Sequence, residues 1–445
     1  MSVTAQPDDA FNAWGRVARP HHVRVAPRFR DELPEAIAEA LREGRTALPV
    51  GFGRSYGRSC LNDGGALIDM SRLDHVLAFD KTTGVIRVEA GASLAAILEL
   101  IVPHGWFLPT TPGTSQVSVG GAIANDVHGK NHHAAGSFGC AVRRMELLRT
   151  DGTRLELSLD ENPELFAATI GGLGLTGVIA WAEFQLAPIK SAFLEQEAIE
   201  FANVNRFFDL AEESAVEWEV TAAWVDCLAT GGELGRGVFF RANWLDDGDL
   251  DPKSLDQKIS VPIGAPGWAL NPMTLKAFNG VYRWLAARSE GPERTHYRPV
   301  FYPLDAVGGW NKLYGGRGFY QHQSVVPPEH ARAAVAEMLA IIAKAKEGSF
   351  LAVLKTFGDK ASPGLLSFPM EGATLALDFP NRGQRTLDLL ARLDAVVAEA
   401  GGRLYPAKDG RMSAEMFKTG YPAWETFAAH IDPGLCSDFW RSVTA

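Results

Sequence analysis

Hydrophobic residues recur at helical or alternating spacing near the start of the chain, and this pattern predicts a mixture of helices and strands. Residues 31–42 carry apolar side chains at helical spacing, with acidic residues in the first turn, which predicts a short surface helix. A strand is expected over residues 46–50, and the alternation in residues 66–70 predicts another. Residues 84–101 predict a strand, a glycine turn and a helix.

The pattern continues with two further strand signals. Residues 143–158 predict a hairpin, because two alternating segments flank the turn residues Asp151 and Gly152. Residues 171–188 are almost wholly apolar, which predicts a buried strand that ends at Pro188. Together these elements predict a small α+β unit.

Near residue 190 the glycine-rich loops give way to alternating, aromatic-rich segments, and we place a domain boundary there. Residues 318–346 predict a strand, a Pro-Pro break and an amphipathic helix, and residues 349–358 predict another strand. Strand pairs are expected over residues 366–380, followed by a helix over 386–402 that glycine ends. Two strand-helix-strand passages predict one antiparallel sheet with helices on one face. Residues 252–299 show no clean period and predict a long irregular excursion, either a mobile insertion or a segment facing a membrane.

Composition excludes several classes of function. The 445 residues are 46% hydrophobic and 22% charged, as in an ordinary globular protein, and the net charge of −10 argues against nucleic acid as a partner. The four cysteines form no C-x-x-C pair, so neither a zinc site nor a redox dithiol is predicted, and reduced cytosolic thiols are the simplest interpretation. Neither a secretory signal nor a membrane-spanning stretch is recognised. We therefore expect a cytoplasmic protein whose membrane contact would be peripheral.

Two glycine-rich loops hold most of the candidate chemistry. Residues 109–139 (PTTPGTSQVSVGGAIANDVHGKNHHAAGSFG) and residues 48–65 (LPVGFGRSYGRSCLNDGG) are both rich in small residues. Glycine lets the backbone approach a ligand closely, and successive N–H groups can hold a phosphate. The alternative is a pair of ordinary surface loops. Neither loop has the pattern of a Rossmann or P-loop nucleotide site.

The histidines of HGKNHH could also suggest a metal site. His132 and His133 are adjacent, and neighbouring side chains in a strand diverge, so we predict that no metal is bound. The alternative for His128, taken alone, is a hydrogen-bonded interior histidine.

Four segments carry a resemblance to a known family. GFGRSYG, PGTSQVSVGGAIANDVHGKNHHAAGSFG, GGLGLTGVI and GGRLYPAKDGR resemble the flavin-binding segments of the vanillyl-alcohol-oxidase-type FAD oxidoreductases and, more narrowly, the decaprenylphosphoryl-β-D-ribose 2′-oxidases. The resemblance implies an α+β, two-domain PCMH-type FAD-binding fold with a substrate domain built on an antiparallel sheet flanked by helices. Residues 1–190 would bind FAD, residues 191–402 would bind substrate, and residues 403–445 would return to the FAD-binding domain.

The resemblance also implies the cofactor and its ligands. Many relatives bind flavin covalently through a histidine in the first glycine loop, where this chain has Arg54 and Ser55, so we expect non-covalent FAD. Backbone N–H groups of residues 51–57 and 118–121 are expected to hold the pyrophosphate. The predicted cofactor-binding residues are Gly51, Gly53, Arg54, Ser55, Tyr56, Gly57, Gly113, Ser118, Val119, Gly120, Gly121, Asn125, His128, Ile179 and Tyr405.

The chemistry of alcohol oxidation suggests the catalytic residues. Lys408 is the first candidate, because a partly desolvated lysine could accept the hydroxyl proton; the alternative is a solvated surface lysine. His128 and Tyr56 are the other catalytic candidates. Lys355 lies between apolar neighbours in a strand, so an inward-facing ammonium would need an anion such as a substrate phosphate. The resemblance implies that Tyr314, Gln321 and Gln323 lie in the substrate pocket. The predicted substrate-binding residues are therefore Lys130, Tyr314, Gln321, Gln323, Lys355 and Lys408.

We expect this chain to oxidise the ribose 2′-hydroxyl of a polyprenylphosphoryl-β-D-ribose to a keto sugar. That step is the first half of an epimerisation toward an arabinose donor for cell-wall or surface glycans, and a separate NAD(P)H-dependent reductase would complete it, with peripheral contact at the inner face of the membrane. The alternatives are a soluble alditol or aldonolactone oxidase with the same fold and a flavin-free binding protein. Ala222, Thr374 and Ala376 replace polar residues of the mycobacterial pocket, which leaves the lipid chain and the sugar open.

Overall fold

A computed structural model describes residues 4–252, 259–260, 291–349, 351–408 and 410–445. The irregular excursion predicted over residues 252–299 lies largely outside these residues. Within it, β15 (Ile259–Ser260) pairs in parallel with β17 (Val307–Gly308).

The N-terminal half begins with a small sheet of order β1-β2-β4-β3. It consists of β1 (Gln6–Asp8), β2 (His22–Val25), β4 (Ala66–Asp69) and β3 (Ala47–Val50), and α1 (Leu33–Ala40) packs against it. The predicted first helix and first strand are therefore confirmed. The alternation expected in β4 is wrong, since all four residues are buried. Leu67 packs into one hydrophobic core and Ala66 and Ile68 into another, because both faces of this central strand are covered.

A second, antiparallel sheet completes this half, with order β5-β6-β10-β8-β9. Its strands are β5 (Val76–Asp80), β6 (Val85–Glu89), β10 (Val178–Gln185), β8 (Val142–Leu148) and β9 (Arg154–Ser158). The β8–β9 hairpin and the step from β6 to α2 (Leu94–Ile101) confirm two predictions. The strand expected to end at Pro188 is divided instead. The chain leaves the ladder at Leu186, whose N–H donates to Gly84, and β11 (Ala187–Pro188) pairs with β7 (Trp106–Phe107).

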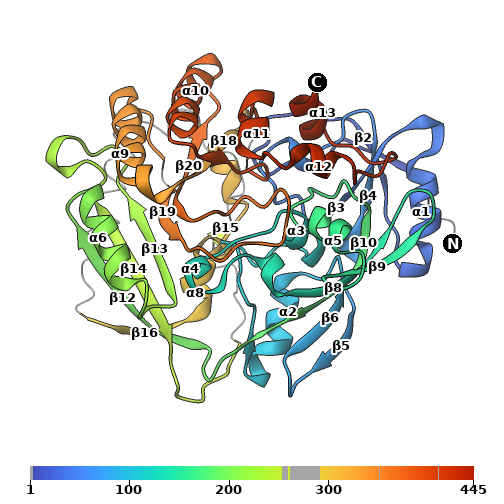
Figure 1. Cartoon of the computed structure of the whole chain (residues 1–445), viewed down its shortest axis with the longest axis horizontal. Coiled ribbons are helices and arrows are strands. Elements are labelled where there is room, and N and C mark those ends of the chain that lie inside the picture. The colour runs from blue at the N-terminus through green and yellow to red at the C-terminus, as the bar shows by residue number, and fades with distance from the viewer. Residues whose placement is uncertain (1–3, 253–258, 261–290, 350, 409) are drawn as a thin grey trace.

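The C-terminal half is built on one antiparallel sheet of eight strands, in the order β16-β12-β14-β13-β19-β20-β18-β21. The strands are β16 (Glu293–His296), β12 (Phe193–Phe201), β14 (Gly237–Trp244), β13 (Val220–Val225), β19 (Ala352–Phe357), β20 (Gly372–Pro380), β18 (Phe319–Val326) and β21 (Arg403–Leu404). Three helices cover its outer face, as predicted (Figure 1): α6 (Val204–Ser214), α9 (Pro328–Ala345) and α10 (Gln384–Glu399). The other face turns toward the N-terminal half.

The strand pairs predicted over residues 366–380 are wrong, because this stretch contains only β20. Before β20 the carbonyls of Phe368 and Pro369 accept hydrogen bonds from the Arg403 guanidinium rather than from a neighbouring strand. Proline also lacks the N–H that a ladder needs. Short helices connect the layers: α3 (Val119–Ala124), α4 (His132–Ala135), α5 (Pro163–Thr169), α8 (Tyr297–Phe301), α11 (Ala414–Gly420), α12 (Trp424–Ala428) and α13 (Asp438–Thr444).

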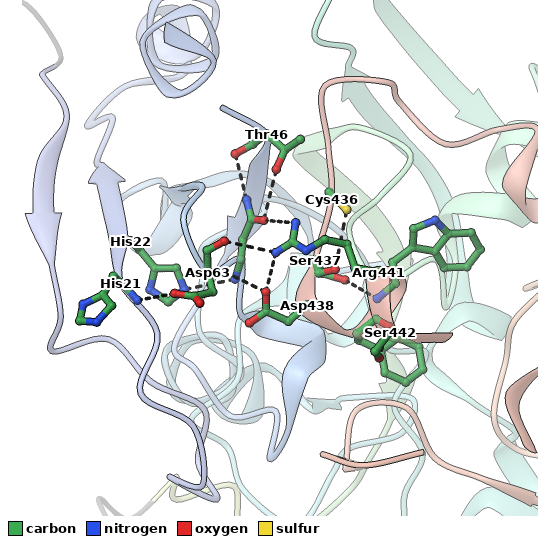
Figure 2. Close-up of polar contacts among 12 residues, drawn as sticks. His21, His22, Thr46, Asp63, Cys436, Ser437, Asp438, Arg441 and Ser442 are labelled. Atoms are coloured by element: carbon green, nitrogen blue, oxygen red, sulfur yellow. Dashed lines mark hydrogen bonds and ion pairs between the residues drawn. The ribbon is translucent and has the colours of Figure 1, made fainter. Parts of the chain in front are cut away.

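The C-terminal segment leaves the large sheet through β21 and lies against residues 47–63 of the N-terminal half (Figure 1). Leu435 forms a parallel bridge with Ala47, which extends the small sheet by one position. The Asp63 N–H donates to Asp438 Oδ1 at 2.9 Å (Figure 2). The Arg441 guanidinium donates to Asn62 Oδ1 at 2.9 Å. The C-terminal helix therefore closes over the start of the N-terminal half.

Candidate active site

A cavity of about 870 Å³ lies where the two halves meet. Both glycine loops form one wall, and the inner face of the eight-stranded sheet forms the other. Most of the predicted residues line it: Gly51, Gly53, Arg54, Ser55, Tyr56, Gly113, Ser118, Gly120, Gly121, Asn125, His128, Lys130, Ile179, Gln321, Gln323, Lys355, Tyr405 and Lys408. Gly57, Val119 and Tyr314 are not among its lining residues.

The first glycine loop presents its backbone to this cavity. Gly53 has a φ of 61°, a conformation that glycine adopts without strain. A Cβ on Gly51 would lie 2.2 Å from Ser118 Oγ, so a glycine here lets the two loops approach each other. The N–H groups of Gly53, Arg54 and Ser55 have no acceptor among the described residues. This loop therefore offers open donors for an anionic group.

The second glycine loop does not offer the same donors. The Val119 N–H donates to Ala92 at 2.9 Å, the Gly120 N–H donates to Ala90 at 2.7 Å, and the Gly121 N–H is capped by Ser118 Oγ at 3.2 Å. Our expectation that the N–H groups of residues 118–121 hold a pyrophosphate is therefore wrong for these three. Val119 is fully buried in the core. The loop supplies close backbone approach instead.

His128 is a buried, neutral histidine at the centre of the site. Its Nε2 accepts a hydrogen bond from Gln323 Nε2 at 2.9 Å, which places the ring proton on Nδ1, and Nδ1 has no partner among the described residues. The rings of Phe357, Phe368 and Tyr405 surround it. Burial, followed by the nearby Lys355 charge, holds the pKa of His128 well below its usual value.

The sequence pattern suggested that the adjacent histidines lie in a strand, but the structure places them in a helix. His132 and His133 form part of the short helix α4. His133 Nε2 lies 2.7 Å from the Trp218 carbonyl, and His132 packs on the Phe357 ring at 4.3 Å. No group of three or more metal-ligating side chains occurs in the described part of the chain.

Two lysines contribute positive charge to the cavity, Lys130 from the second glycine loop and Lys355 from β19. Lys130 Nζ donates to the Val300 carbonyl, and Lys355 Nζ donates to the Gly129 carbonyl at 3.3 Å. Neither has a carboxylate partner within the described ranges. Burial lowers the pKa of Lys130 to about 8 and that of Lys355 to about 7, and the charges of Lys130 and Lys408 contribute to the lower pKa of Lys355. An anion bound between Lys130 and Lys355 would relieve both effects.

A third lysine lies beside the first glycine loop. Lys408 Nζ stands 4.0 Å from the centre of the Tyr56 ring, and burial lowers its pKa to about 8. Tyr314, predicted in the pocket, packs behind Tyr56 instead and stacks on Phe319 at 4.2 Å. Its aromatic ring is held by this cluster and so does not line the cavity.

Small residues of the large sheet line the cavity at two positions. Ala222 in β13 and Ala376 in β20 line it, and Gln323 lies opposite Ala376 in the sheet register. Thr374 stands opposite Lys355 and accepts a hydrogen bond from Gln323 at 3.4 Å. The pocket is therefore wider at Ala222 and Ala376 than larger side chains would allow.

Sequence reasoning missed several residues of this site. Asp305 holds the second glycine loop, since its carboxylate accepts hydrogen bonds from the Thr114 hydroxyl at 2.5 Å and the Ser115 N–H at 2.7 Å. Trp14 packs under the Arg54 guanidinium at 4.4 Å. Asp378 faces Gln321 from the neighbouring strand. Its signal was present in GATLALDFP, where Asp378 shares the alternation of Thr374 and Ala376.

Comparison with known proteins agrees with this geometry. Residues 21–158 match a family model described as an FAD binding domain. The chain is 35% identical to the decaprenylphosphoryl-β-D-ribose oxidase of Mycolicibacterium smegmatis, over 100% of this chain and 99% of that protein. The chain belongs to this oxidase family. It is an FAD-dependent oxidoreductase with an α+β, PCMH-type fold.

Two further relatives show how far the similarity extends. An uncharacterised Streptomyces coelicolor protein is 33% identical over 79% of this chain and 99% of its own length. Mouse L-gulonolactone oxidase is 33% identical over 35% of this chain and 35% of its own length. The lactone oxidase is therefore a distant relative of this oxidase.

The residues of this oxidase fit FAD. The N–H groups of the first loop that have no acceptor suit a pyrophosphate. Because Gly51 and Gly120 have no Cβ atoms, the backbone at these positions can pack closely against Ser118 and Ala90. Bound FAD supplies the hydride acceptor for alcohol oxidation. Within the described ranges, no helix has both the length and the apolar character that crossing a membrane requires.

Proposed function

We propose that this oxidase removes hydride from C2 of the ribose in a polyprenylphosphoryl-β-D-ribose and gives the 2′-keto sugar. The observation that carries the proposal is the pair Lys130 and Lys355, two cations that face the cavity without a carboxylate partner among the described residues. The M. smegmatis relative, named for the same class of substrate, supports it.

A phosphodiester is the anion that these lysines would hold. Keeping ammonium groups out of water costs free energy unless an anion compensates it. Lys130 and Lys408 both lie close enough to Lys355 for their charges to lower its pKa, and Lys408 Nζ stands 4.0 Å from the centre of the Tyr56 ring. The phosphate of the substrate would lie between Lys130 and Lys355, and a ribose hydroxyl would lie at Lys408.

Lys408 would take the hydroxyl proton. Because its pKa is about 8, a substantial fraction is neutral amine near pH 8, and this form can accept a proton. His128 is neutral, with its Nδ1 proton free to donate, so it would orient a ligand oxygen rather than act as the base.

FAD would be bound without a covalent link. Arg54, which stands where covalent relatives have histidine, donates from Nε to the Gln116 carbonyl at 3.2 Å. Its guanidinium carbon also stacks on Trp14. This arrangement supports a positioning role for Arg54, because a guanidinium is a poor nucleophile.

The keto sugar needs a second enzyme to become the arabinose epimer. We propose a separate NAD(P)H-dependent reductase, because an oxidase that leaves reduced flavin cannot return hydride to the opposite face of the sugar without turning the product over. A lipid-linked substrate also favours peripheral contact with the inner face of the cell membrane.

The test compares Lys355→Ala with Lys360→Ala, an exposed lysine of the loop that follows the same strand. For a short-chain polyprenylphosphoryl-ribose, Lys355→Ala should raise KM about 10-fold or more, and Lys360→Ala should not. A methyl riboside without phosphate should show no such difference. An unchanged KM for the phosphorylated substrate would favour an alditol or aldonolactone oxidase.

A further inference from the structure

Asp378 is a fully buried carboxyl on the cavity side of the large sheet. It is 0% exposed and lies opposite Gln321 in the register of β18 and β20. Ala376, two positions before it on the same face, lines the cavity. The apolar residues Leu377 and Phe379 point to the helix-covered core instead. The Asp378 side chain is therefore on the same face of the sheet as the cavity-lining residues. Packing alone would favour an apolar residue at such a buried position.

The surroundings of Asp378 satisfy it only in part. Gln321 Nε2 donates to Oδ1 at 2.6 Å, but Oδ2 makes no hydrogen bond to any described residue. The Tyr314 hydroxyl faces the same carboxyl without completing a bond to Oδ2. Burial raises the pKa of Asp378 to about 7, and Gln321, Lys408 and Tyr314 oppose that rise. A buried carboxyl oxygen without a hydrogen bond lowers the stability of the fold, so its presence here calls for a functional explanation.

Gln321 connects Asp378 to the Lys408 site, because its side chain bonds both Asp378 and the Tyr56 side chain whose ring Lys408 contacts. Burial lowers the pKa of Lys408, and the charge of Asp378 is what raises it. Tyr56 contacts the amine through its ring face, at 4.0 Å. The other titratable groups that Lys408 influences are Lys355 and His128. Among the titratable groups described near Lys408, Asp378 is the carboxylate, and its full negative charge can stabilise the ammonium beyond the attraction of the Tyr56 ring face.

We propose, resting on the oxidation proposed above, that Asp378 is a positioning residue that acts through Lys408. Its buried carboxylate stabilises the ammonium that forms when the Lys408 amine takes the substrate's hydroxyl proton. In that step the O–H bond breaks and its proton goes to Nζ. The C–H bond breaks and its hydride goes to bound flavin, so the carbinol carbon is oxidised to a carbonyl and the flavin is reduced.

The test measures the Lys408 amine directly, so it needs neither substrate nor turnover. The full-length protein with FAD is acetylated with trace acetic anhydride across pH 6–10, and the extent of labelling at Lys408 is read by mass spectrometry. Because a carboxylate stabilises the ammonium, Asp378→Asn should move the Lys408 labelling midpoint about 1 pH unit lower. Asp226→Asn is the matched control, because Asp226 is a buried carboxylate of the same half that pairs with Arg236. It should leave the Lys408 midpoint unchanged.

Asp378→Asn should also move the rising limb of the pH profile for flavin reduction to lower pH and reduce its plateau about 10-fold, while Asp378→Glu should restore part of the plateau. An unchanged Lys408 midpoint in Asp378→Asn would overturn the proposal. If Asp378→Asn does not fold, the labelling midpoints of Lys408 and Lys355 in the wild-type protein test the proposal instead. Lys408 should then label with a higher midpoint than Lys355, and an equal or lower midpoint would overturn the proposal. Failure of the oxidation itself would appear separately, as absent flavin reduction with an intact labelling shift.

Discussion

The amide of Gln323 donates a hydrogen bond to Nε2 of His128 at 2.9 Å, and this bond joins the large sheet to the second glycine loop. Gln323 belongs to β18, whereas His128 follows α3 by four residues. The active site therefore depends on contact between the two halves. The Thr221 N–H, which donates to the Lys130 carbonyl at 2.9 Å, fixes the same loop to β13.

Gln323→Leu should destabilise the protein and slow flavin reduction. The substitution leaves the buried Nε2 of His128 without its donor, a loss of about 1–3 kcal/mol, and frees the imidazole to change tautomer. Urea denaturation measures the first effect. Ser324→Ala is the control on the opposite face of the strand, and it should cost less than about 1 kcal/mol. Equal stability of Gln323→Leu and wild type would contradict this role.

Gly129→Ala should prevent the loop from closing correctly. A Cβ at Gly129 would lie 2.7 Å from the Thr111 carbonyl oxygen and 2.8 Å from Thr110 Oγ1, so the backbone or side chains of the loop would have to shift. We expect a loss of about 1–3 kcal/mol and weaker retention of FAD on gel filtration. Gly232→Ala, with open space around its Cβ position, should behave as wild type.

Lys355→Met should stabilise the ligand-free protein while it weakens substrate binding. The pKa of Lys355 is about 7 in the folded protein against 10.5 unfolded, so the burial penalty is complete below pH 7 and vanishes as pH rises to 10.5. Removing the charge should therefore gain about 0.5–2 kcal/mol at pH 6.5 and almost nothing at pH 10.5. Chemical denaturation at both values, with Lys360→Met as an exposed control, measures this. A gain that grows with pH would refute the explanation.

Arg441→Ala should loosen the C-terminal helix. Its guanidinium bonds Asn62 Oδ1 at 2.9 Å, and this contact holds α13 against the first half, whereas its bond to Asp438 lies within the helix. We expect a loss of about 1–3 kcal/mol and faster hydrogen exchange in residues 435–444. Ser442→Ala should have little effect, because its hydroxyl bonds only the Phe439 carbonyl within the helix.

Local patterns in the sequence predicted the parts of the site that depend on local chemistry. The glycine loops could be recognised because glycine at Gly51 and Gly53 marks close backbone approach, and Lys408 and His128 lie within distinctive motifs. Long-range contacts could not be read in this way. The N–H groups of Val119 and Gly120 donate to Ala92 and Ala90, on a segment some 30 residues away, so the donors expected for a pyrophosphate were already used.

The helix and strand periods likewise predicted the large sheet and the helices on its outer face. They failed where tertiary packing decides. β4 is buried on both faces and so loses its alternation, and Tyr314 is held by Phe319 behind Tyr56. Asp378 was overlooked because one polar residue in an apolar strand acquires meaning only when its neighbour across the sheet is known.

Anaerobic mixing of the purified protein with a short-chain polyprenylphosphoryl-β-D-ribose tests the central claim most directly. The account predicts that the flavin band at about 450 nm bleaches, that the sugar is recovered as its 2′-keto form, and that acid precipitation leaves FAD in the supernatant. Flavin that stays oxidised with this substrate, but bleaches with a lactone or an alditol, would contradict it.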